Sequence, residues 1–180
     1  MNVIETKLSG CLIIEPTIYR DDRGFFLEEW HRDKYSEIGI TSEFVQDNRS
    51  RSSKNILRGL HFQINKPQGK LVSVTSGCVY DVAVDLRVDS ATFGQYVGVV
   101  LTGDKNNQLY IPPGFAHGFC VLSEYADFHY KCTDFYDPKD ESGIIWNDNE
   151  IAIDWPIDSP ILSPKDNLLP TFADYKKLPK

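Results

Sequence analysis

Short segments of alternating hydropathy, separated by turn residues, are the feature that most constrains the fold of this chain. The stretch LVSVTSGCVYDVAVDLRV, residues 71–88, contains two such segments on either side of TSG. Side chains two positions apart on a strand share a face. In the second segment one face carries Tyr80, Val82, Val84, Leu86 and Val88, and the other carries Asp81, Ala83, Asp85 and Arg87. The pattern predicts two strands joined by a turn.

The same pattern continues further along the chain. Residues 95–114 read as strand, polar turn and strand, and residues 117–138 repeat this order with SEYA, residues 123–126, as the turn. Helices are expected only around residues 31–39 and in the tail, residues 172–180. Many short strands with frequent turns are typical of an all-β barrel or jelly roll, which can hold a small ligand in its interior.

Composition narrows the class of protein. A chain of 180 residues with 41% hydrophobic content suits one globular domain over residues 1–180. The formal net charge is −7 and no basic run is present, so we predict no nucleic-acid partner. An acidic total still permits a phosphorylated ligand, because local arginines and lysines can form a cationic pocket.

The N-terminus and the cysteines bear on the location of the protein. The opening MNVIETKLSG lacks a basic region followed by a long apolar one, so no secretion signal is predicted. No segment approaches the ~20 apolar residues needed to cross a bilayer. Cys11, Cys78, Cys120 and Cys132 form no CxxC pair, so neither a zinc knuckle nor a redox motif is indicated. We interpret them as reduced core thiols and predict a cytoplasmic protein.

One histidine lies in a run that otherwise reads as a half-buried strand. The run is ILRGLHFQ, residues 56–63, and it contains His61. Three interpretations are open for an ionisable ring at this position: a hydrogen-bonded core histidine, a metal ligand or a catalytic base.

Three other segments carry candidate functional residues. In QGKLVSV, Lys70 enters an apolar strand, so it must lie at a strand end or face a polar cavity, where it can stabilise an oxyanion. In YIPPGFAHGF, His117 follows a Pro-Pro-Gly turn and is either a turn histidine or a functional ring. In FHYKCTDFY, alternation places Tyr130 and Tyr136 on one face, either as packing aromatics or as a phenol acid and a stacking wall.

The segment around His117 also bears on metal binding. PPGFAHGF resembles the second cupin motif, and in metal-binding cupins the first motif contains His-x-His followed by Glu. Here the corresponding stretch LHFQINKPQGK has Gln63 in place of the second histidine, and no glutamate follows. One histidine and one glutamine form a poor site for a transition metal. We therefore predict a cupin-type barrel without a metal.

Ten segments together resemble the dTDP-4-dehydrorhamnose 3,5-epimerase family of nucleotide-sugar epimerases. They occur in the family's order and at similar spacing: DDRGFFLEEW, FVQDNRSRS, LRGLHFQ, QGKLV, VYDVAVDLR, TFGQY, YIPPGFAHGF, SEYADFHYKCTDFY, GIIWNDNEIAIDWP and ILSPKDNLLP. The resemblance implies a cupin-type jelly roll with a few short helices, a homodimer, and no metal or organic cofactor. One departure is Ser73, where the family often has an arginine.

The resemblance also implies roles for individual residues. His61 matches the family's general base, Asp166 the carboxylate that orients it, Tyr130 the general acid and Lys70 the lysine beside the C4 oxygen of the sugar. The positions that match dTDP-sugar contacts are Arg23, Glu28, Gln46, Asp47, Asn48, Arg58, His117, Tyr136, Glu141 and Lys165. Because Arg23 and Arg58 are distant in sequence, either the fold or a dimer partner must bring them together.

These residue types suit the chemistry that the resemblance implies. In a 4-keto sugar the C3 and C5 protons are acidified by the adjacent ketone, and a neutral histidine with a pKa near ~6.5 can remove one. A lysine offsets the charge of the resulting enolate, and an acid on the opposite face returns a proton with inversion. The expected reaction converts dTDP-4-dehydro-6-deoxy-D-glucose to dTDP-4-dehydro-L-rhamnose and needs no redox cofactor.

Other functions are also compatible with parts of the pattern. Related enzymes epimerise only C3 or only C5, or act on another 4-keto nucleotide sugar. A sugar-nucleotide binding module would keep the arginines and lose the acid or the base, whereas His61, Lys70, Tyr130 and Asp166 are all present. A metal-dependent cupin oxygenase is the remaining alternative, which metal analysis would reveal.

Overall fold

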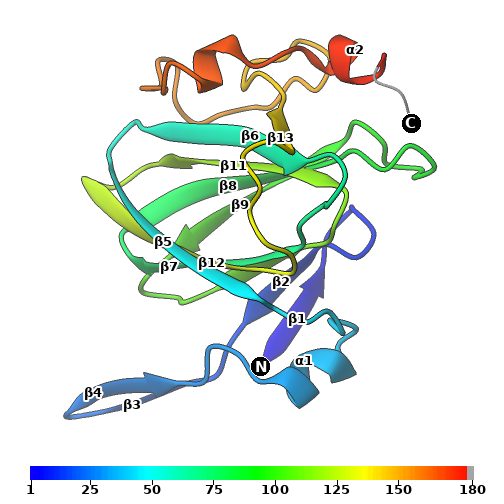
Figure 1. Ribbon diagram of the computed structural model, residues 1–180. Coiled ribbons are helices and arrows are strands. Elements are labelled where there is room, and N and C mark those ends of the chain that lie inside the picture. The colour runs from blue at the N-terminus through cyan, green and yellow to red at the C-terminus, as the bar shows by residue number, and fades with distance from the viewer. Residues whose placement is uncertain (178–180) are drawn as a thin grey trace.

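Two antiparallel sheets pack face to face in the computed structural model, which describes residues 1–177 (Figure 1). In sheet order, the six-stranded sheet contains β1 (Asn2–Glu5), β2 (Leu12–Glu15), β10 (Gln108–Ile111), β7 (Lys70–Ser76), β12 (Tyr125–Cys132) and β5 (Gln46–Ser53). The five-stranded sheet contains β13 (Glu141–Gly143), β6 (Leu57–Gln63), β11 (Phe115–Val121), β8 (Cys78–Asp85) and β9 (Tyr96–Thr102). The predicted all-β jelly roll is confirmed.

The predicted alternation accounts for the packing of β8. Val82 and Val84 point to the outer face of the five-stranded sheet, where they join the apolar cluster covered by the C-terminal segment. Val79 and Ala83 point inward and join the core between the sheets. Asp81 and Asp85 also face inward and are fully buried. The inner face of this strand is therefore unusually polar for a barrel core.

Two segments outside the sheets cover their outer faces. Residues 144–177, with the 3-10 helix η1 (Asp166–Leu168) and the helix α2 (Phe172–Tyr175), pack on the five-stranded sheet. Helix α1 (Arg32–Glu37) and its neighbours pack on part of the six-stranded sheet, where the Tyr35 hydroxyl donates to Gln108 Oε1 at 2.8 Å. Within the described residues, no helix is both long and apolar enough to span a membrane.

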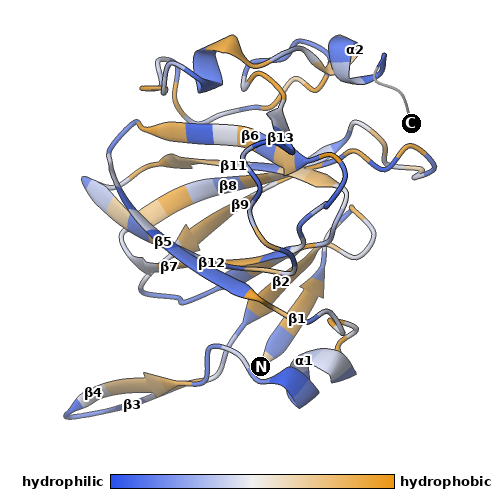
Figure 2. Ribbon diagram, in the orientation of Figure 1, coloured by the Kyte–Doolittle hydropathy of each residue, from blue (hydrophilic) through white to orange (hydrophobic). Residues whose placement is uncertain are grey.

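A hairpin projects away from the sandwich (Figure 1). It consists of β3 (Ile18–Asp21) and β4 (Gly24–Leu27), which pair with each other and with no other strand in residues 1–177. Figure 2 shows that β4 is hydrophobic although it lies outside the body of the protein. Its side chains Phe25 and Phe26 are both exposed.

Several expected element boundaries need correction. β12 begins at Tyr125, inside the predicted turn SEYA, and ends at Cys132, so Tyr136 lies in the following loop. Helix α1 is shorter than residues 31–39, and α2 ends at Tyr175; the expected helical residues 178–180 lie outside the described residues. All four cysteines are free thiols, but Cys78 is only half-buried.

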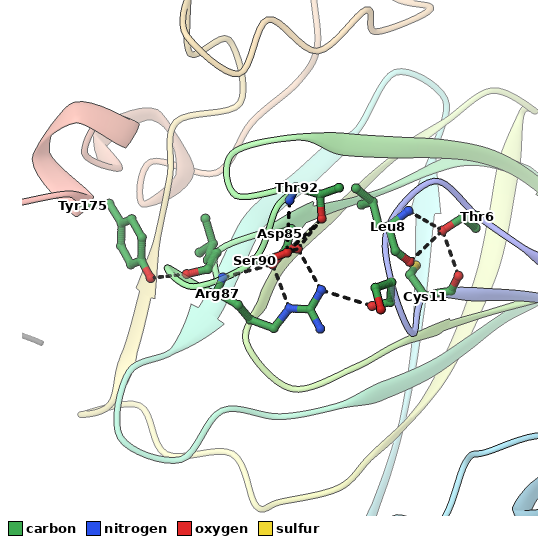
Figure 3. A network of polar contacts seen from close by, with 10 residues as sticks. Thr6, Leu8, Cys11, Asp85, Arg87, Ser90, Thr92 and Tyr175 are labelled. Carbon is green, nitrogen blue, oxygen red and sulfur yellow. Dashed lines mark hydrogen bonds and ion pairs between the residues drawn. The ribbon is translucent and has the colours of Figure 1, made fainter.

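A polar network fixes the end of β8 (Figure 3). Asp85 accepts hydrogen bonds from the Arg87 guanidinium and from the hydroxyls of Ser90 and Thr92. Arg87 also donates to the backbone carbonyl of Ser9, so the network joins β8 to the N-terminal segment. Burial opposes ionisation, but these hydrogen bonds lower the pKa of Asp85 to about 2. The carboxylate therefore remains charged inside the protein at neutral pH.

Candidate active site

A cavity of about 320 Å³ lies between the two sheets. From the six-stranded sheet it is lined by Gln46, Asn48, Ser50, Lys70, Phe128 and Tyr130. From the five-stranded sheet it is lined by Arg58, His61, Phe62, Gln63, His117, Phe119 and Glu141, and the loops add Gln68 and Tyr136. The cavity is large enough for a small ligand and combines ionisable groups with aromatic walls.

The two histidines of the cavity lie side by side on β6 and β11. His61 and His117 are direct partners in the register of these strands. Gly59 permits the close approach, because its φ is +121° and a Cβ there would lie 2.6 Å from the Cα of Gly118. Direct partners on adjacent antiparallel strands project to the same face. Both rings therefore enter the cavity from the same sheet.

His61 forms a hydrogen-bonded pair with Asp166. The distance from His61 Nε2 to Asp166 Oδ1 is 2.7 Å, and the carboxylate is 5% exposed. Burial opposes ionisation of Asp166, but the hydrogen bond from His61 lowers the pKa of this carboxyl below its usual value. Because the ionised carboxylate accepts from Nε2–H, the lone pair of the neutral ring is on Nδ1. His61 is thus arranged as a proton acceptor.

Lys70 and Tyr130 face the histidines from the opposite sheet. Lys70 begins β7, an interior strand, so it faces the cavity and not a sheet edge. Burial lowers the pKa of Lys70, while the negative groups Asp81 and Glu141 oppose this shift. Burial raises the pKa of the Tyr130 phenol, which therefore keeps its proton at neutral pH. This side of the cavity can stabilise negative charge and donate a proton.

A carboxylate at the rim holds two neighbouring side chains. Tyr136 donates its hydroxyl hydrogen to Glu141 Oε2 at 2.7 Å, and the Lys165 ammonium forms an ion pair with the same oxygen. The hydrogen bond to Glu141 raises the pKa of Tyr136 to about 12. Lys165 directly precedes Asp166 in the chain. The rim therefore connects the loop after β12 with the loop that carries the partner of His61.

Polar side chains of β5 and β6 complete the cavity wall. Gln46 Nε2 donates to Asn48 Oδ1 at 3.0 Å, and Gln46 Oε1 accepts from the backbone of Tyr136. Arg58 is exposed at the cavity and donates from Nε to Ser52 Oγ at 3.1 Å. Its remaining guanidinium nitrogens are available for a ligand anion.

Three of the predicted binding residues lie away from this cavity. Arg23 is in the turn of the β3–β4 hairpin, where it pairs with Asp21. Glu28 pairs with Lys34 of α1. Asp47 is on the outer face of β5 and pairs with Lys131. Within one copy of the chain, the structure does not bring Arg23 and Arg58 together.

The structure adds residues that the sequence did not single out. Gln63 and Gln68 line the cavity, and Asp81 lies behind His117. Gln63, which replaces a cupin histidine, donates to the Lys66 and Phe135 carbonyls. For Asp81 the alternation of β8 indicated only the strand face, which it shares with Ala83 and Asp85.

Among the described residues, no group of three or more His, Cys, Asp and Glu side chains is arranged to hold a metal ion. Ser73 is buried on β7 between Gln108 and His129, its partners in the two adjacent strands, and does not line the cavity. This departure from the family pattern leaves the cavity unchanged.

Comparisons with known proteins agree with the geometry. A family model described as dTDP-4-dehydrorhamnose 3,5-epimerase matches residues 5–174. The Escherichia coli dTDP-4-dehydrorhamnose 3,5-epimerase is 54% identical over 99% of this chain and 98% of its own. A Legionella pneumophila 3,5-epimerase, solved in complex with dTDP-4-keto-L-rhamnose, superposes with a TM-score of 0.94 at 54% identity and covers 99% of this chain and 97% of its own.

A more distant relative differs in the reaction named for it. The 3'-monoepimerase ChmJ from Streptomyces bikiniensis, solved with dTDP-quinovose, superposes with a TM-score of 0.89 at 30% identity. The match covers 96% of this chain and 88% of that one. The same fold is thus found in enzymes that invert one carbon and in enzymes that invert two.

Proposed function

The chain belongs to the dTDP-4-dehydrorhamnose 3,5-epimerase family, and we propose that its cavity performs this isomerisation with His61 as base and Tyr130 as acid. The reaction inverts C3 and C5 of dTDP-4-dehydro-6-deoxy-D-glucose and yields dTDP-4-dehydro-L-rhamnose for dTDP-L-rhamnose biosynthesis. One observation supports these roles above all others. The histidine and the tyrosine enter the cavity from opposite sheets, as inversion requires.

In the first step the base removes a proton next to the ketone. The C–H proton moves to Nδ1 of His61, and the electron pair of the broken bond delocalises onto the C4 oxygen as an enolate. Asp166 stabilises the imidazolium that forms, because its ionised oxygen is 2.7 Å from Nε2. Lys70, on the opposite wall, offsets the negative charge of the enolate.

In the second step the carbon is protonated from the other side. The Tyr130 phenol gives its proton to the carbon as the enolate electrons return, which inverts the centre. The resulting phenolate regains a proton, and the imidazolium loses one to solvent, so protons balance over the cycle. Repetition at the second carbon gives the L-configured product.

The rim provides groups suited to the nucleotide. Arg58 and Lys165 are cations near the mouth of the cavity and would pair with the diphosphate. Tyr136 offers an aromatic face for a base, while Gln46 and Asn48 offer hydrogen-bonding groups. Lys165 is held by Glu141, so a bound diphosphate would compete with this carboxylate for the ammonium.

A homodimer would complete the site. The β3–β4 hairpin exposes Tyr19, Phe25 and Phe26, which are 63%, 56% and 69% exposed, and no other strand of the described chain pairs with it. We call this hairpin, together with Glu28 directly after it, the arm. A second copy of the chain would fit the arm, because Arg23 and Glu28 match dTDP-sugar positions but do not line the cavity of their own chain. The arm would carry them to the partner's cavity.

The proposal extends to domain organisation and cellular location. The family match over residues 5–174 supports one domain over residues 1–180. The four free thiols support a reducing, cytoplasmic compartment, where the nucleotide sugar would be processed.

Proton NMR in deuterium oxide tests the proposed function. Chelator-treated protein is incubated with dTDP-4-dehydro-6-deoxy-D-glucose, and deuterium is followed at C3 and C5. We expect label and inversion at both carbons. Label at one carbon would assign a mono-epimerase, and binding without any label would refute the enzymatic role on this substrate.

A further inference from the structure

The cavity contains a second histidine–aspartate pair that the proposed mechanism does not use. His117 Nε2 lies 2.9 Å from Asp81 Oδ2, and the two side chains are 8% and 0% exposed. The pair repeats the arrangement of His61 and Asp166 on the neighbouring strand, with the same ring nitrogen bound to a carboxylate. The floor of the cavity therefore carries two oriented imidazoles.

Asp81 is an unusual residue for this place in the core. It lies on the inner face of β8, beside a core that includes the stacked rings of Phe119 and Phe128, whose centroids are 4.1 Å apart. One of its oxygens, Oδ1, is buried without a hydrogen-bond partner among the described residues. A buried carboxylate with incomplete hydrogen bonding destabilises a fold, so an apolar residue would serve packing better. Its presence points to a role at the cavity.

Asp81 determines how the His117 ring is presented. The carboxylate accepts from Nε2–H, which leaves the lone pair of the neutral ring on Nδ1. Phe128 stacks near the ring at a centroid distance of 5.9 Å and an angle of 22°, which limits its rotation. Burial lowers the pKa of His117 despite the opposing effect of Asp81, so the ring is neutral and able to accept a proton at neutral pH.

The substrate offers two protons on one face. In the chair of the 4-keto sugar, the C3 hydroxyl and the C5 methyl are equatorial, so both C–H bonds are axial and parallel. His61 and His117 are register partners with Cβ atoms expected about 5 Å apart. Two adjacent bases on one sheet thus match two parallel C–H bonds on one ring face, with Tyr130 on the opposite sheet.

We propose that the two histidines divide the reaction, with His61 taking the proton from one carbon and His117, positioned by Asp81, taking it from the other. This inference rests on the proposed function. At each carbon the C–H bond breaks, the proton goes to a histidine Nδ1 and the electron pair goes to the C4 oxygen. Asp81 is a positioning residue that acts through His117.

Position-resolved deuterium exchange tests this division. His61→Asn, His117→Asn and Asp81→Asn are compared for exchange at C3 and at C5 of dTDP-4-dehydro-6-deoxy-D-glucose. We expect His117→Asn to lower exchange at one carbon by about 10²-fold or more, and Asp81→Asn to lower it at the same carbon by about 10-fold or more. The two carbons could be inverted in a fixed order. In that case, loss of the histidine that acts at the first carbon stops exchange at both carbons, whereas loss of the histidine that acts at the second carbon leaves exchange at the first.

The division therefore requires that at least one histidine variant keeps exchange at a single carbon. It is overturned if both variants retain the wild-type ratio of C3 to C5 exchange, or if neither retains exchange at one carbon. His129→Asn is the matched control, since His129 lies on the outer face of β12 away from the cavity, and it should exchange normally. Melting curves and dTDP binding verify that each variant is folded. Failure of wild-type protein to exchange at either carbon would instead refute the proposed function.

Discussion

In the proposed mechanism His61 acts as a base with the carboxylate of Asp166 hydrogen-bonded behind it. The two residues are 105 positions apart, and the loop that carries Asp166 is tied to the cavity by the Lys165–Glu141 ion pair. The Ser163 hydroxyl also accepts from the Asp166 backbone N–H at 3.0 Å, which fixes the start of η1. The orientation of the His61 ring thus depends on the position of a distant loop.

Replacement of Asp166 by Asn tests this dependence. The amide has nearly the same shape but cannot stabilise an imidazolium, so we expect kcat to fall by about 10²- to 10⁴-fold while KM changes little. Steady-state kinetics gives both parameters. Asp127→Asn is the control, because Asp127 pairs with Arg51 on the outer face of the sheet. A kcat equal to that of the wild type would remove Asp166 from the mechanism.

The predictability of the site varied among its residues. Physical reasoning narrowed Lys70 to a strand end or a polar cavity, since a lysine is rarely buried without a partner, and the structure shows that it lines the cavity. Asp166 came only with the family resemblance, because no local pattern connects it with His61. The pairing of Asp81 with His117 required the structure, since a strand pattern gives the face of a residue and not its contacts across strands.

At the scale of elements, strands with apolar alternation were predictable and polar ones were not. β7 and β8 were recognised from their pattern, with the turn at Gly77. β5, with the sequence QDNRSRSS, has no apolar alternation because its inward side chains line the cavity. The polar side chains that line the cavity thus replace the apolar alternation by which this strand could have been predicted.

The Asp85 network predicts an acid-dependent loss of stability at the end of β8. The pKa of Asp85 is about 2 in the folded protein, against about 3.9 in an unfolded chain. A lowered pKa stabilises the fold above the unfolded value, and this stabilisation is lost as the pH falls through the folded value. We expect a loss of about 2 to 3 kcal/mol between about pH 5 and pH 1.

Urea unfolding of wild type and Asp85→Asn measures this contribution. The difference in unfolding free energy between the two proteins should be largest above about pH 5 and shrink as the pH falls toward 2. If the difference in unfolding free energy does not change with pH, the charge of Asp85 is not the source of that difference. The neutral variant should also be less stable at pH 7, because Arg87 loses its ionised partner.

At the scale of the whole molecule, the proposed mechanism divides its chemistry between the two sheets. The five-stranded sheet carries His61 and His117, and the six-stranded sheet carries Lys70 and Tyr130. The jelly roll was predictable from the many short strands, but the projecting β3–β4 hairpin was not, because its contacts lie outside its own chain in the proposed dimer.

Mixed dimers test the exchange of arms. We expect the His61→Asn homodimer to have impaired catalysis. We expect the Arg23→Ala homodimer to be impaired at low substrate concentration. If the arm of one copy serves the cavity of the other, a mixed dimer has one site with both defects and one intact site. The mixture should therefore be more active than the average of the two variants, as assayed by product NMR. Activity equal to that average would contradict the arm exchange.

In the proposed mechanism, proton removal and proton return occur from opposite walls of the cavity, and the Tyr130→Phe variant separates the two steps. The variant is incubated with substrate in deuterium oxide, and exchange and configuration are measured separately by NMR. With the base intact and the acid removed, deuterium should still enter the substrate with retention of configuration, while inversion falls by about 10²-fold or more. Inversion at the wild-type rate, or a loss of exchange and inversion in equal proportion, would contradict the two-wall mechanism.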